Sequence, residues 1–389
     1  PAPSPTTART VVKLVSSLPR AGASRAQSDA IVNGIRQAIA EQNGQVGKFS
    51  IAYEDWDDAS PQSGDWDPDL EAANARRAVS DPDVLFYLGP YNSGAAKVSL
   101  PVLNRAGLVA ISPANSYAGL TKPGSAEPNE PEIYRPTGKI TYYRVSPTDD
   151  IQGKVAAEFA KYKGWKRVYV LHDGGLYGQG TADIFLSTAA QLGLPLVSSA
   201  AEKIDPQAPE YLAILQRIRR LRPDAIYFGG TTQPSGGRIA RDVLTAAGPQ
   251  GRLLAPNGCF QTTFIKAAGA DVLNERAFVT FGGLPPDQLT GGGAAFVAAY
   301  RQRFKIEPEG YSVNGYVVAQ VALKALAKAG RKNREAVRQA MVGSGQVDGA
   351  LGTWQFDANG DTSLATISVS TVKDGRFQFV TAVNQDAAN

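Results

Sequence analysis

The sequence predicts an α/β protein of two similar lobes, each a parallel-sheet α/β sandwich, joined by a multi-stranded hinge. Short apolar runs alternate with helical patterns along most of the chain, which is typical of parallel sheets covered by helices on both faces. The alternation starts a second time after a long loop, so the same unit occurs twice. A chain of 389 residues is longer than one ordinary core accommodates, which agrees with two lobes.

The first lobe opens on the apolar run 10–15, which is expected to be a strand. The helix that follows, 24–41, carries Ile31, Ile35 and Ile39 at intervals of four, which places them on one face. Further strands are expected at 49–53, 84–88 and 108–111, and further helices at 67–80 and 94–106. This order of strands and helices predicts a parallel sheet.

A segment rich in Pro, Gly and Glu, residues 115–139, has no periodicity and is expected to be a long surface loop. A strand at 142–145 resumes the pattern. The second lobe then repeats the alternation, with strands at 167–171, near 196, at 224–228 and at 252–255, and helices at 149–163, 177–192, 211–220 and from 237. The repetition indicates that the second lobe resembles the first.

The last part of the chain departs from simple alternation. It is expected to form a strand at 278–280, helices at 293–304, 310–329 and 333–342, and an antiparallel pair from 353 to 380 with Asn359-Gly360 as a turn. We infer that the chain returns to the first lobe for these helices and ends in the second. The predicted boundaries are 10–146 plus 285–345 for the first lobe, 147–284 plus 346–385 for the second, and 1–9 for a flexible tether.

Composition and charge exclude several classes of function. The 40 basic and 36 acidic residues are interspersed and leave a net charge of only +4, so we expect no nucleic-acid partner. One Cys and one His rule out an intramolecular disulfide and a Cys/His metal cluster, and we expect neither a metal nor a cofactor. The acidic runs 55–58 and 65–67 lack calcium-loop spacing and are interpreted as a solvated loop.

The chain has no apolar run of about 18–20 residues, the length that a membrane span needs. Its first residues, Pro1–Thr7, are typical of a flexible tether rather than of a natural N-terminus. We therefore expect an export signal or a lipid-anchor segment upstream of Pro1 in the full gene, and the gene sequence tests this expectation.

Ligands of open parallel sheets bind beyond the carboxyl ends of the strands. The segments in that position are rich in glycine, hydroxyl and amide groups: 89–94, 112–116, 172–178, 229–233 and 256–258. Ser93 and Ser116 stand just before expected helix starts. A serine in such a position caps the helix, and together with the free backbone N–H groups it also suits a carboxylate.

The same segments offer little for catalysis. His172 is the only histidine, and no second His or Cys stands near it in the sequence to form a metal or catalytic pair. It is interpreted as a structural residue beside Asp173. No Gly-x-Ser-x-Gly elbow stands before a helix, and the sequence has no Gly-x-x-x-x-Gly-Lys-Ser/Thr phosphate loop. We therefore expect no catalytic residue and no enzyme activity. Tyr177, at another helix start, fits a packed surface tyrosine as well as a ligand contact.

Several short motifs occur in an order and spacing that together are specific. They are Leu88-Gly89-Pro90 followed by Ser93, Ile111-Ser112-Pro113-Ala114, His172-Asp173 with Tyr177-Gly178-Gln179-Gly180, and Gly352-Thr353-Trp354-Gln355-Phe356-Asp357. With them, from about Val11 to Val383, the chain resembles the type I periplasmic (solute) binding proteins, specifically the leucine/isoleucine/valine-binding receptors of ABC importers. The resemblance implies the two-lobed fold with its hinge.

The resemblance also implies ligand-binding roles at matching positions. Ser93 and Ser116 match hydroxyl residues that hold the ligand carboxylate, and Ala114 matches a residue whose carbonyl accepts from the ligand amine. Tyr177 matches a tyrosine that covers the ligand from the second lobe. Tyr311 falls at an aromatic residue that lines the side-chain pocket.

Three positions depart from the family pattern. Asn257 stands where the family usually has a Glu that pairs with the ligand ammonium, Thr231 where another Tyr is frequent, and Gln27 where a first-lobe Tyr is common. A buried ammonium without a charged partner is costly. The carboxylate half of the recognition is therefore expected to be intact, and recognition of an amine is left open.

The function that the resemblance implies is binding of an amino acid, branched-chain or otherwise apolar, by hinge closure, followed by delivery to the membrane permease of an ABC importer. The protein is expected to act as a monomer in the periplasm or outside the cell, with or without a lipid anchor. Two alternatives stay open. The same fold could bind a carboxylate or amide without an amino group, such as an aromatic acid, or it could be a ligand-sensing domain.

Overall fold

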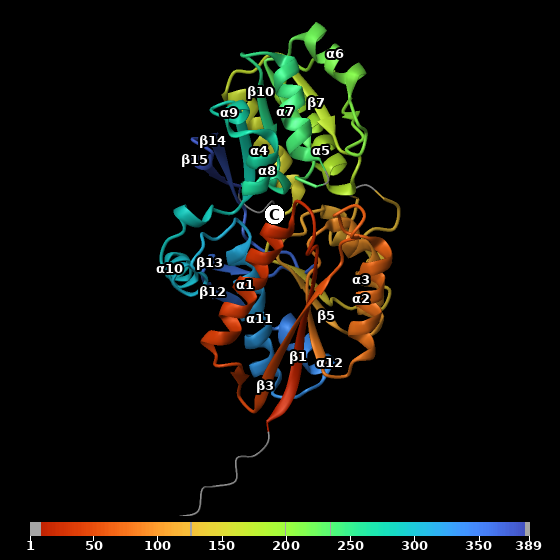
Figure 1. Cartoon of the computed structure of the whole chain (residues 1–389). Helices are drawn as coiled ribbons and strands as arrows, with labels where there is room; N and C mark the ends of the chain where they lie inside the picture. The colour runs from red at the N-terminus through yellow and green to blue at the C-terminus, as the bar shows by residue number, and fades with distance from the viewer. Residues whose placement is uncertain (1–8, 125–126, 199, 234, 386–389) are drawn as a thin grey trace, which may run out of the picture.

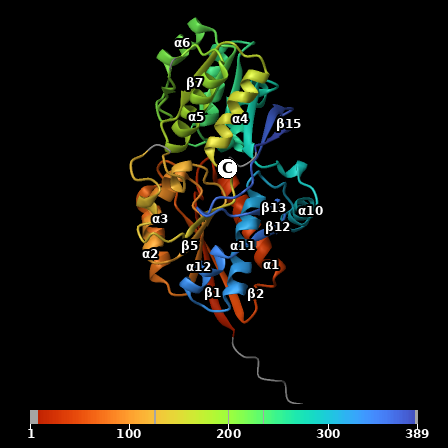
Figure 2. The same ribbon diagram turned by 180° about the vertical axis from the view of Figure 1, so that it is seen from behind.

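The computed structural model describes residues 9–124, 127–198, 200–233 and 235–385. Figures 1 and 2 show two lobes, one above the other, each built around a central sheet. The tether predicted at 1–9 lies outside the described residues except for its last position. Across the described ranges, no helix combines the length and the apolar character that crossing a membrane requires.

The first lobe is built on a six-stranded sheet. Its strands lie in the order β2 (Gln45–Val46), β3 (Phe49–Asp57), β1 (Thr10–Leu18), β4 (Val84–Leu88), β5 (Val109–Ser112) and β6 (Tyr142–Arg144). β2 pairs antiparallel with β3, and the other neighbours are parallel. Every residue of β4 is buried, as expected for a central strand with helices on both faces.

Helices cover both faces of this sheet (Figure 1). They are α1 (Arg25–Glu41), α10 (Gly292–Phe304), α11 (Ser312–Ala329) and α12 (Arg334–Val342), and on the other side α2 (Pro68–Ser80) and α3 (Ser93–Arg105). Two glycines let α1 and α11 approach closely, because a Cβ on Gly34 would lie 2.1 Å from Ser312 O and one on Gly315 would lie 2.2 Å from Ile31 O. The late helices α10, α11 and α12 therefore lie with the first lobe.

The second lobe has a seven-stranded sheet. Its strands lie in the order β15 (Arg376–Asn384), β14 (Thr366–Lys373), β11 (Ala277–Gly282), β10 (Arg252–Ala255), β9 (Ala225–Gly229), β7 (Val168–His172) and β8 (Glu202–Lys203). Its helices are α4 (Asp149–Tyr162), α5 (Leu176–Leu192), α6 (Leu212–Leu221), α7 (Gly236–Ala247), α8 (Thr262–Ala268) and α9 (Ala270–Leu273). Strands β8 to β11 are parallel, whereas β14 and β15 add an antiparallel edge. The predicted pair of parallel α/β sandwiches is thus confirmed.

A separate hairpin lies outside both large sheets. It consists of β12 (Gln346–Gly349) and β13 (Gly352–Gln355). Beyond it, the Phe356 ring packs edge-on against Tyr143 with centroids 5.0 Å apart, and Asp361 pairs with Arg144 at 2.6 Å. The hairpin and the turn after it therefore lie with the first lobe, although the sequence assigned 346–385 as a whole to the second. Strand pattern alone does not tell which lobe a hairpin will pack against.

The two lobes are connected three times. The chain crosses between β6 and α4, back between β11 and α10, and again between β13 and β14. Three connections in parallel restrict relative twisting of the lobes while they allow bending. This arrangement agrees with the predicted multi-stranded hinge.

Two buried carboxyl groups lie in the first lobe near the start of α2. Asp58 and Glu71 have no solvent exposure. Glu71 accepts from Ser17 Oγ at 2.6 Å and from Tyr87 OH at 3.0 Å, whereas neither oxygen of Asp58 has a hydrogen-bond partner among the described residues. The interpretation of this acidic run as a solvated loop is therefore wrong for Asp58. Within the same described residues, no cluster of His, Cys, Asp and Glu could hold a metal ion.

These carboxyl groups predict that stability decreases towards alkaline pH. Burial, together with the charge of Glu71, raises the pKa of Asp58, and burial raises that of Glu71. A carboxyl whose pKa is raised on folding favours the folded state while protonated, and this benefit is lost as the pH rises. We expect the free energy of unfolding in urea to fall between about pH 4 and pH 8, and Asp58→Asn to remove much of this fall. The exposed Asp69→Asn is the control, and an unchanged pH dependence in Asp58→Asn would contradict the prediction.

Candidate functional site

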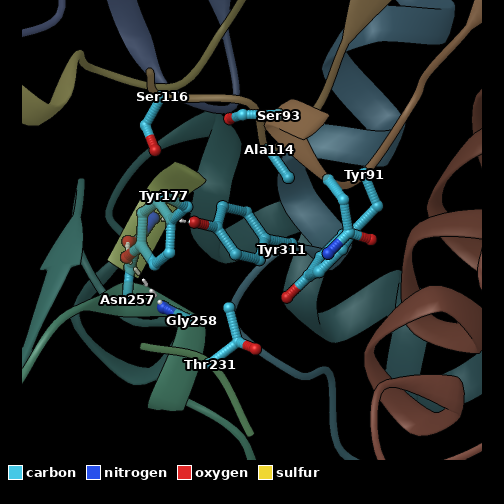
Figure 3. Close-up of a pocket in the computed structure, with 10 residues that line it drawn as sticks. Tyr91, Ser93, Ala114, Ser116, Tyr177, Thr231, Asn257, Gly258 and Tyr311 are labelled. Atoms are coloured by element: carbon cyan, nitrogen blue, oxygen red, sulfur yellow. Dashed lines mark hydrogen bonds between the residues drawn. The ribbon is translucent and has the colours of Figure 1, made fainter. Parts of the chain in front are cut away.

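A pocket lies between the lobes, where the strand ends of the two sheets face one another. Its empty space of about 310 Å³ includes some open solvent, so the pocket is small in this closed arrangement. It is lined by Tyr91, Asn92, Ser93, Ala114, Ser116, Tyr177, Thr231, Asn257, Gly258 and Tyr311. Figure 3 shows these side chains converging from both lobes. All of the predicted site residues except Gln27 are therefore brought together in one place.

The first lobe contributes a helix N-terminus and a loop. Ser93 is the first residue of α3, and the preceding Asn92 makes no side-chain capping bond. Ser116 lies before the short 3₁₀ turn η1 (Ala118–Leu120), which also has no side-chain cap. Neither serine caps its helix. Ser93 Oγ accepts from Tyr117 N at 3.4 Å and keeps its own proton for a ligand, whereas the Ser116 hydroxyl lies beside the Asp149 carboxyl group and lowers its pKa. The unpaired N–H groups and partial positive charge at the start of α3 suit a carboxylate.

Hydrogen bonds between the two strand-end loops hold this wall in place. Ser112 Oγ donates to Pro90 O at 2.8 Å and accepts from Asn115 N at 2.9 Å. Asn115 Nδ2 donates to Tyr91 O at 2.8 Å. The loop after β5 is thus tied to the loop after β4, and Ala114 is kept beside the start of α3.

The second lobe contributes a tyrosine and an asparagine that bond to each other. Tyr177 OH donates to Asn257 Oδ1 and accepts from Gly258 N at 3.1 Å (Figure 3). Asn257 Nδ2 in turn donates to Tyr311 OH from the first lobe. A glutamate has no N–H and could only accept from the two tyrosine hydroxyls, and it would bring a negative charge to this position. Asn257 therefore links tyrosines from the two lobes without adding a charge.

Gln27 lies behind the pocket wall rather than in it. It has no solvent exposure, its Oε1 accepts from Tyr311 N, and its Nε2 donates to Phe260 O, each at 3.4 Å. Its side chain thus supports Tyr311, and direct contact with a ligand, as the sequence predicts, does not fit this position. Thr231 does line the pocket, but its hydroxyl donates to Gln233 O at 2.7 Å and so stabilises the loop to which it belongs.

Direct bonds between the lobes surround the pocket. Gln261 Nε2 of the second lobe donates to Tyr91 OH of the first at 3.3 Å, and Gln233 Nε2 donates to Gly64 O at 2.7 Å. Such bonds require the two lobes to be close together. The structure therefore shows a closed arrangement, in which the pocket is largely screened from solvent.

Sequence reasoning missed three lining residues, Tyr91, Asn92 and Gly258, although all three lie in the strand-end segments. Tyr91 is 6% exposed and packs edge-on against Tyr311 with ring centroids 6.0 Å apart. A Cβ on Gly258 would lie only 3.0 Å from Tyr177 Cε1, so glycine lets the Tyr177 ring approach. The sequence signal that points to these three residues is their position directly after strands of a parallel sheet.

Asp149 is a further residue that the sequence did not single out. It begins α4, is 1% exposed, and donates its backbone N–H to Ser116 O at 2.8 Å. Neither carboxylate oxygen has a hydrogen-bond partner in the described part of the chain. Burial raises its pKa to about 7, against the opposing influence of the Ser116 hydroxyl and the Arg144 charge. A titratable carboxyl group thus lies next to a pocket wall that is otherwise neutral.

Two tyrosines of the pocket and the nearby histidine are neutral. Burial raises the pKa of Tyr177 and of Tyr311 well above the usual range, so both keep their hydroxyl protons. Burial lowers the pKa of His172, whose Nδ1 accepts from Gly174 N at 3.1 Å. His172 is not a lining residue, which agrees with its interpretation as a structural residue.

Two lobes that enclose a small pocket between the carboxyl ends of their sheets define a solute-binding protein that closes on its ligand. The chain belongs to the periplasmic binding protein family, whose model matches residues 11–376. It is similar to the Leu/Ile/Val-binding protein BraC3 of Rhizobium johnstonii, with 28% identity over 365 residues that cover 92% of this chain and 91% of that protein. The family predicted from the sequence is therefore confirmed.

Solved structures show the same fold. The leucine-binding protein LivK of Thermotoga maritima has a TM-score of 0.83 at 24% identity and covers 96% of this chain and 99% of its own. A solute-binding protein of R. palustris in complex with benzoate has a TM-score of 0.80 at 18% identity and covers 97% of this chain and 98% of its own. The predicted two-lobed architecture is confirmed by these likenesses.

Proposed function

We propose that this protein is the extracytoplasmic substrate-binding protein of an ABC importer and binds an amino acid with a branched-chain or other apolar side chain. The pocket between the lobes carries this proposal, because both lobes supply polar partners to it. A ligand that bridges the lobes stabilises the closed form and presents it to a membrane permease. The protein acts as a monomer and performs no chemistry on its ligand.

The carboxylate of the ligand lies at the start of α3 in this proposal. Ser93 and Ser116 donate their hydroxyl protons to it, and the helix dipole favours its negative charge. Since Ser93 is 4% and Ser116 2% exposed, these bonds form away from competing water. Tyr91, Tyr177 and Tyr311 enclose the rest of the pocket and suit an apolar side chain.

The ammonium group pairs with Asp149 rather than with position 257. Asn257 carries no charge, and its amide is already bonded to two tyrosines. Asp149 has a carboxylate without a hydrogen-bond partner among the described residues and lies next to Ser116, and Ala114 lines the same wall. The charge that Asn257 lacks is thus supplied from the first turn of α4.

A second candidate is a carboxylate without an amino group, such as an aromatic acid. The neutral Asn257 favours it, and the R. palustris protein of the same fold is in complex with benzoate. With a pKa of about 7, Asp149 is protonated in part at neutral pH and tolerates such a ligand.

Titration calorimetry and thermal unfolding with L-leucine, L-isoleucine, L-phenylalanine, isovalerate and benzoate test the proposal. We expect an apolar L-amino acid at 100 times its dissociation constant to raise the unfolding temperature by about 3 °C. Ser93→Ala is expected to weaken its binding by about 10- to 100-fold, because a charge-assisted hydrogen bond is lost. Ser99→Ala, a buried serine of the same helix that does not line the pocket, is the control. Absence of binding by every panel member would refute the proposal.

A further inference from the structure

A cluster of polar and aromatic side chains in the first lobe centres on a buried carboxylate. Glu130 is 4% exposed and accepts from Tyr134 OH at 2.6 Å and from Tyr117 OH at 2.8 Å. Lys97 Nζ lies 3.0 Å from the same carboxylate and 4.9 Å from the centre of the Tyr117 ring. We call these four residues the Glu130 cluster. A buried charge with this many partners is strongly held, so the cluster fixes the orientation of Tyr117.

The backbone of Tyr117 is held as firmly as its side chain. Tyr117 N donates to Ser93 Oγ at 3.4 Å, and Tyr117 O accepts from Arg144 Nη1 at 2.7 Å. A Cβ on Gly119 would lie 2.1 Å from Glu130 Oε2 and 2.5 Å from Tyr117 Cε1, so glycine is what lets the carboxylate reach the ring. Tyr117 is therefore a rigid element that directly follows the pocket wall.

The Tyr117 ring faces the second lobe. A Cβ on Gly180 of α5 would lie 3.6 Å from Tyr117 Cδ2, which is ordinary van der Waals contact. Leu176, also on α5, packs against the apolar cluster that contains Tyr117 and Leu120. Tyr117 is not among the residues that line the pocket. In the closed arrangement α5 thus rests on Tyr117 beside the ligand site rather than within it.

We propose that the Glu130 cluster holds Tyr117 as a fixed contact surface for α5 and thereby increases ligand affinity by stabilising the closed form. The residues of the cluster act as positioning residues, because none of them contacts the ligand. This inference rests on the proposed function, since affinity depends on closure only in a protein that closes on its ligand.

A contact that acts only on closure affects the affinities of all ligands alike. When only the closed form binds tightly, the apparent dissociation constant is inversely proportional to the closed fraction. A contact outside the pocket changes that fraction by one factor, whatever the ligand. A residue of the pocket wall, in contrast, changes the affinities of different ligands by different factors.

Tyr117→Ala is therefore expected to weaken L-leucine and benzoate binding by the same factor of about ten, because an aromatic contact between the lobes is lost. Glu130→Gln keeps the size of the side chain. It is expected to weaken the binding of L-leucine and of benzoate by the same factor, which is smaller than that for Tyr117→Ala. Glu132→Gln is the matched control, since Glu132 lies on the same segment with its side chain 65% exposed. Unequal factors for the two ligands, or no loss in Tyr117→Ala, would overturn the proposal.

A variant in the second lobe tests the same contact from the other side. Gly180→Leu places a side chain against the Tyr117 ring only when the lobes are closed, and leucine is a good helix former. It is expected to weaken binding about tenfold or more, and the loss is expected to be smaller in the Tyr117→Ala background. Equal losses in both backgrounds would show that the residues do not meet.

A distance measurement without ligand separates this inference from the proposed function. Spin labels on Arg76→Cys in α2 and Asp183→Cys in α5 occupy exposed sites on different lobes, and the native Cys259 is fully buried. Double electron–electron resonance is expected to show longer distances between the two spin labels in ligand-free Tyr117→Ala than in the ligand-free parent. Unchanged distances would refute the role of Tyr117 even if L-leucine binds. A shift towards longer distances would support it even if no ligand of the panel binds.

Discussion

Asp149→Asn is expected to weaken L-leucine binding by about 100-fold and to strengthen benzoate binding modestly. The Asp149 carboxylate has no hydrogen-bond partner among the described residues and lies next to Ser116 in the pocket wall. A ligand ammonium would supply that partner, whereas a ligand with only a carboxylate gains nothing from a second negative charge. Titration calorimetry of both ligands at pH 8 measures the two effects.

The pH dependence of binding distinguishes the two ligand classes as well. Burial raises the pKa of Asp149 to about 7. An ammonium ligand needs the ionised form, so L-leucine affinity is expected to rise between about pH 5 and pH 8 by up to tenfold per pH unit. Benzoate is repelled by the ionised form, so its affinity is expected to fall over the same range. In Asp149→Asn both slopes disappear.

Asp150→Asn is the matched control for these measurements. Asp150 is the next residue of the helix, is exposed, and pairs with Lys122 at 2.9 Å. Its removal is expected to leave both affinities and both pH slopes unchanged. An L-leucine affinity in Asp149→Asn equal to that of the parent would show that the ammonium group is recognised elsewhere.

Arg144→Met is expected to lower the free energy of unfolding by about 3–5 kcal/mol. Arg144 has no solvent exposure, and its Nε lies 2.6 Å from Asp361 Oδ1. Its other nitrogens donate to Tyr117 O at 2.7 Å and to Thr121 Oγ1. Methionine fills similar space but leaves the Asp361 carboxylate buried without its charged partner. Urea denaturation monitored by circular dichroism measures the loss.

A double variant tests whether the uncompensated charge is the cause. Arg144→Met combined with Asp361→Leu is expected to recover part of the stability, because no buried charge remains. Arg303→Met, at an exposed position, is expected to change the stability by less than about 0.5 kcal/mol. A loss below about 1 kcal/mol in Arg144→Met would mean that solvent reaches Asp361 and hydrates it.

Much of the fold could be predicted because the strands have a local signal. The apolar run predicted as a strand at 84–88 is β4 with the same bounds, and 252–255 is β10. The hairpin β12–β13 shows where that signal ends. Its placement depends on Phe356 packing against Tyr143 and on Asp361 pairing with Arg144, and those contacts join distant parts of the chain.

The pocket could be predicted in part for a related reason. Ser93 and Ser116 follow strands of one parallel sheet, and the carboxyl ends of such strands share an edge, so their convergence follows from sequence order. Asp149 also follows a parallel strand of that sheet, β6, but four residues separate it from the strand end and it already belongs to the next helix. It lies next to the pocket wall because its backbone N–H donates to the Ser116 carbonyl, and sequence spacing does not reveal this contact.

By itself, the sequence determined the alternation of strands and helices in the two α/β lobes and the family, because each is encoded in apolar periodicity and short motifs that are local in the chain. Only the tertiary structure decided which polar groups have partners. Asn257 is bonded to tyrosines of both lobes, Gln27 is directed behind the pocket, and Asp149 is buried without a partner. These outcomes depend on contacts between residues far apart in the chain, and burial then sets the charge and hydrogen bonding of each group.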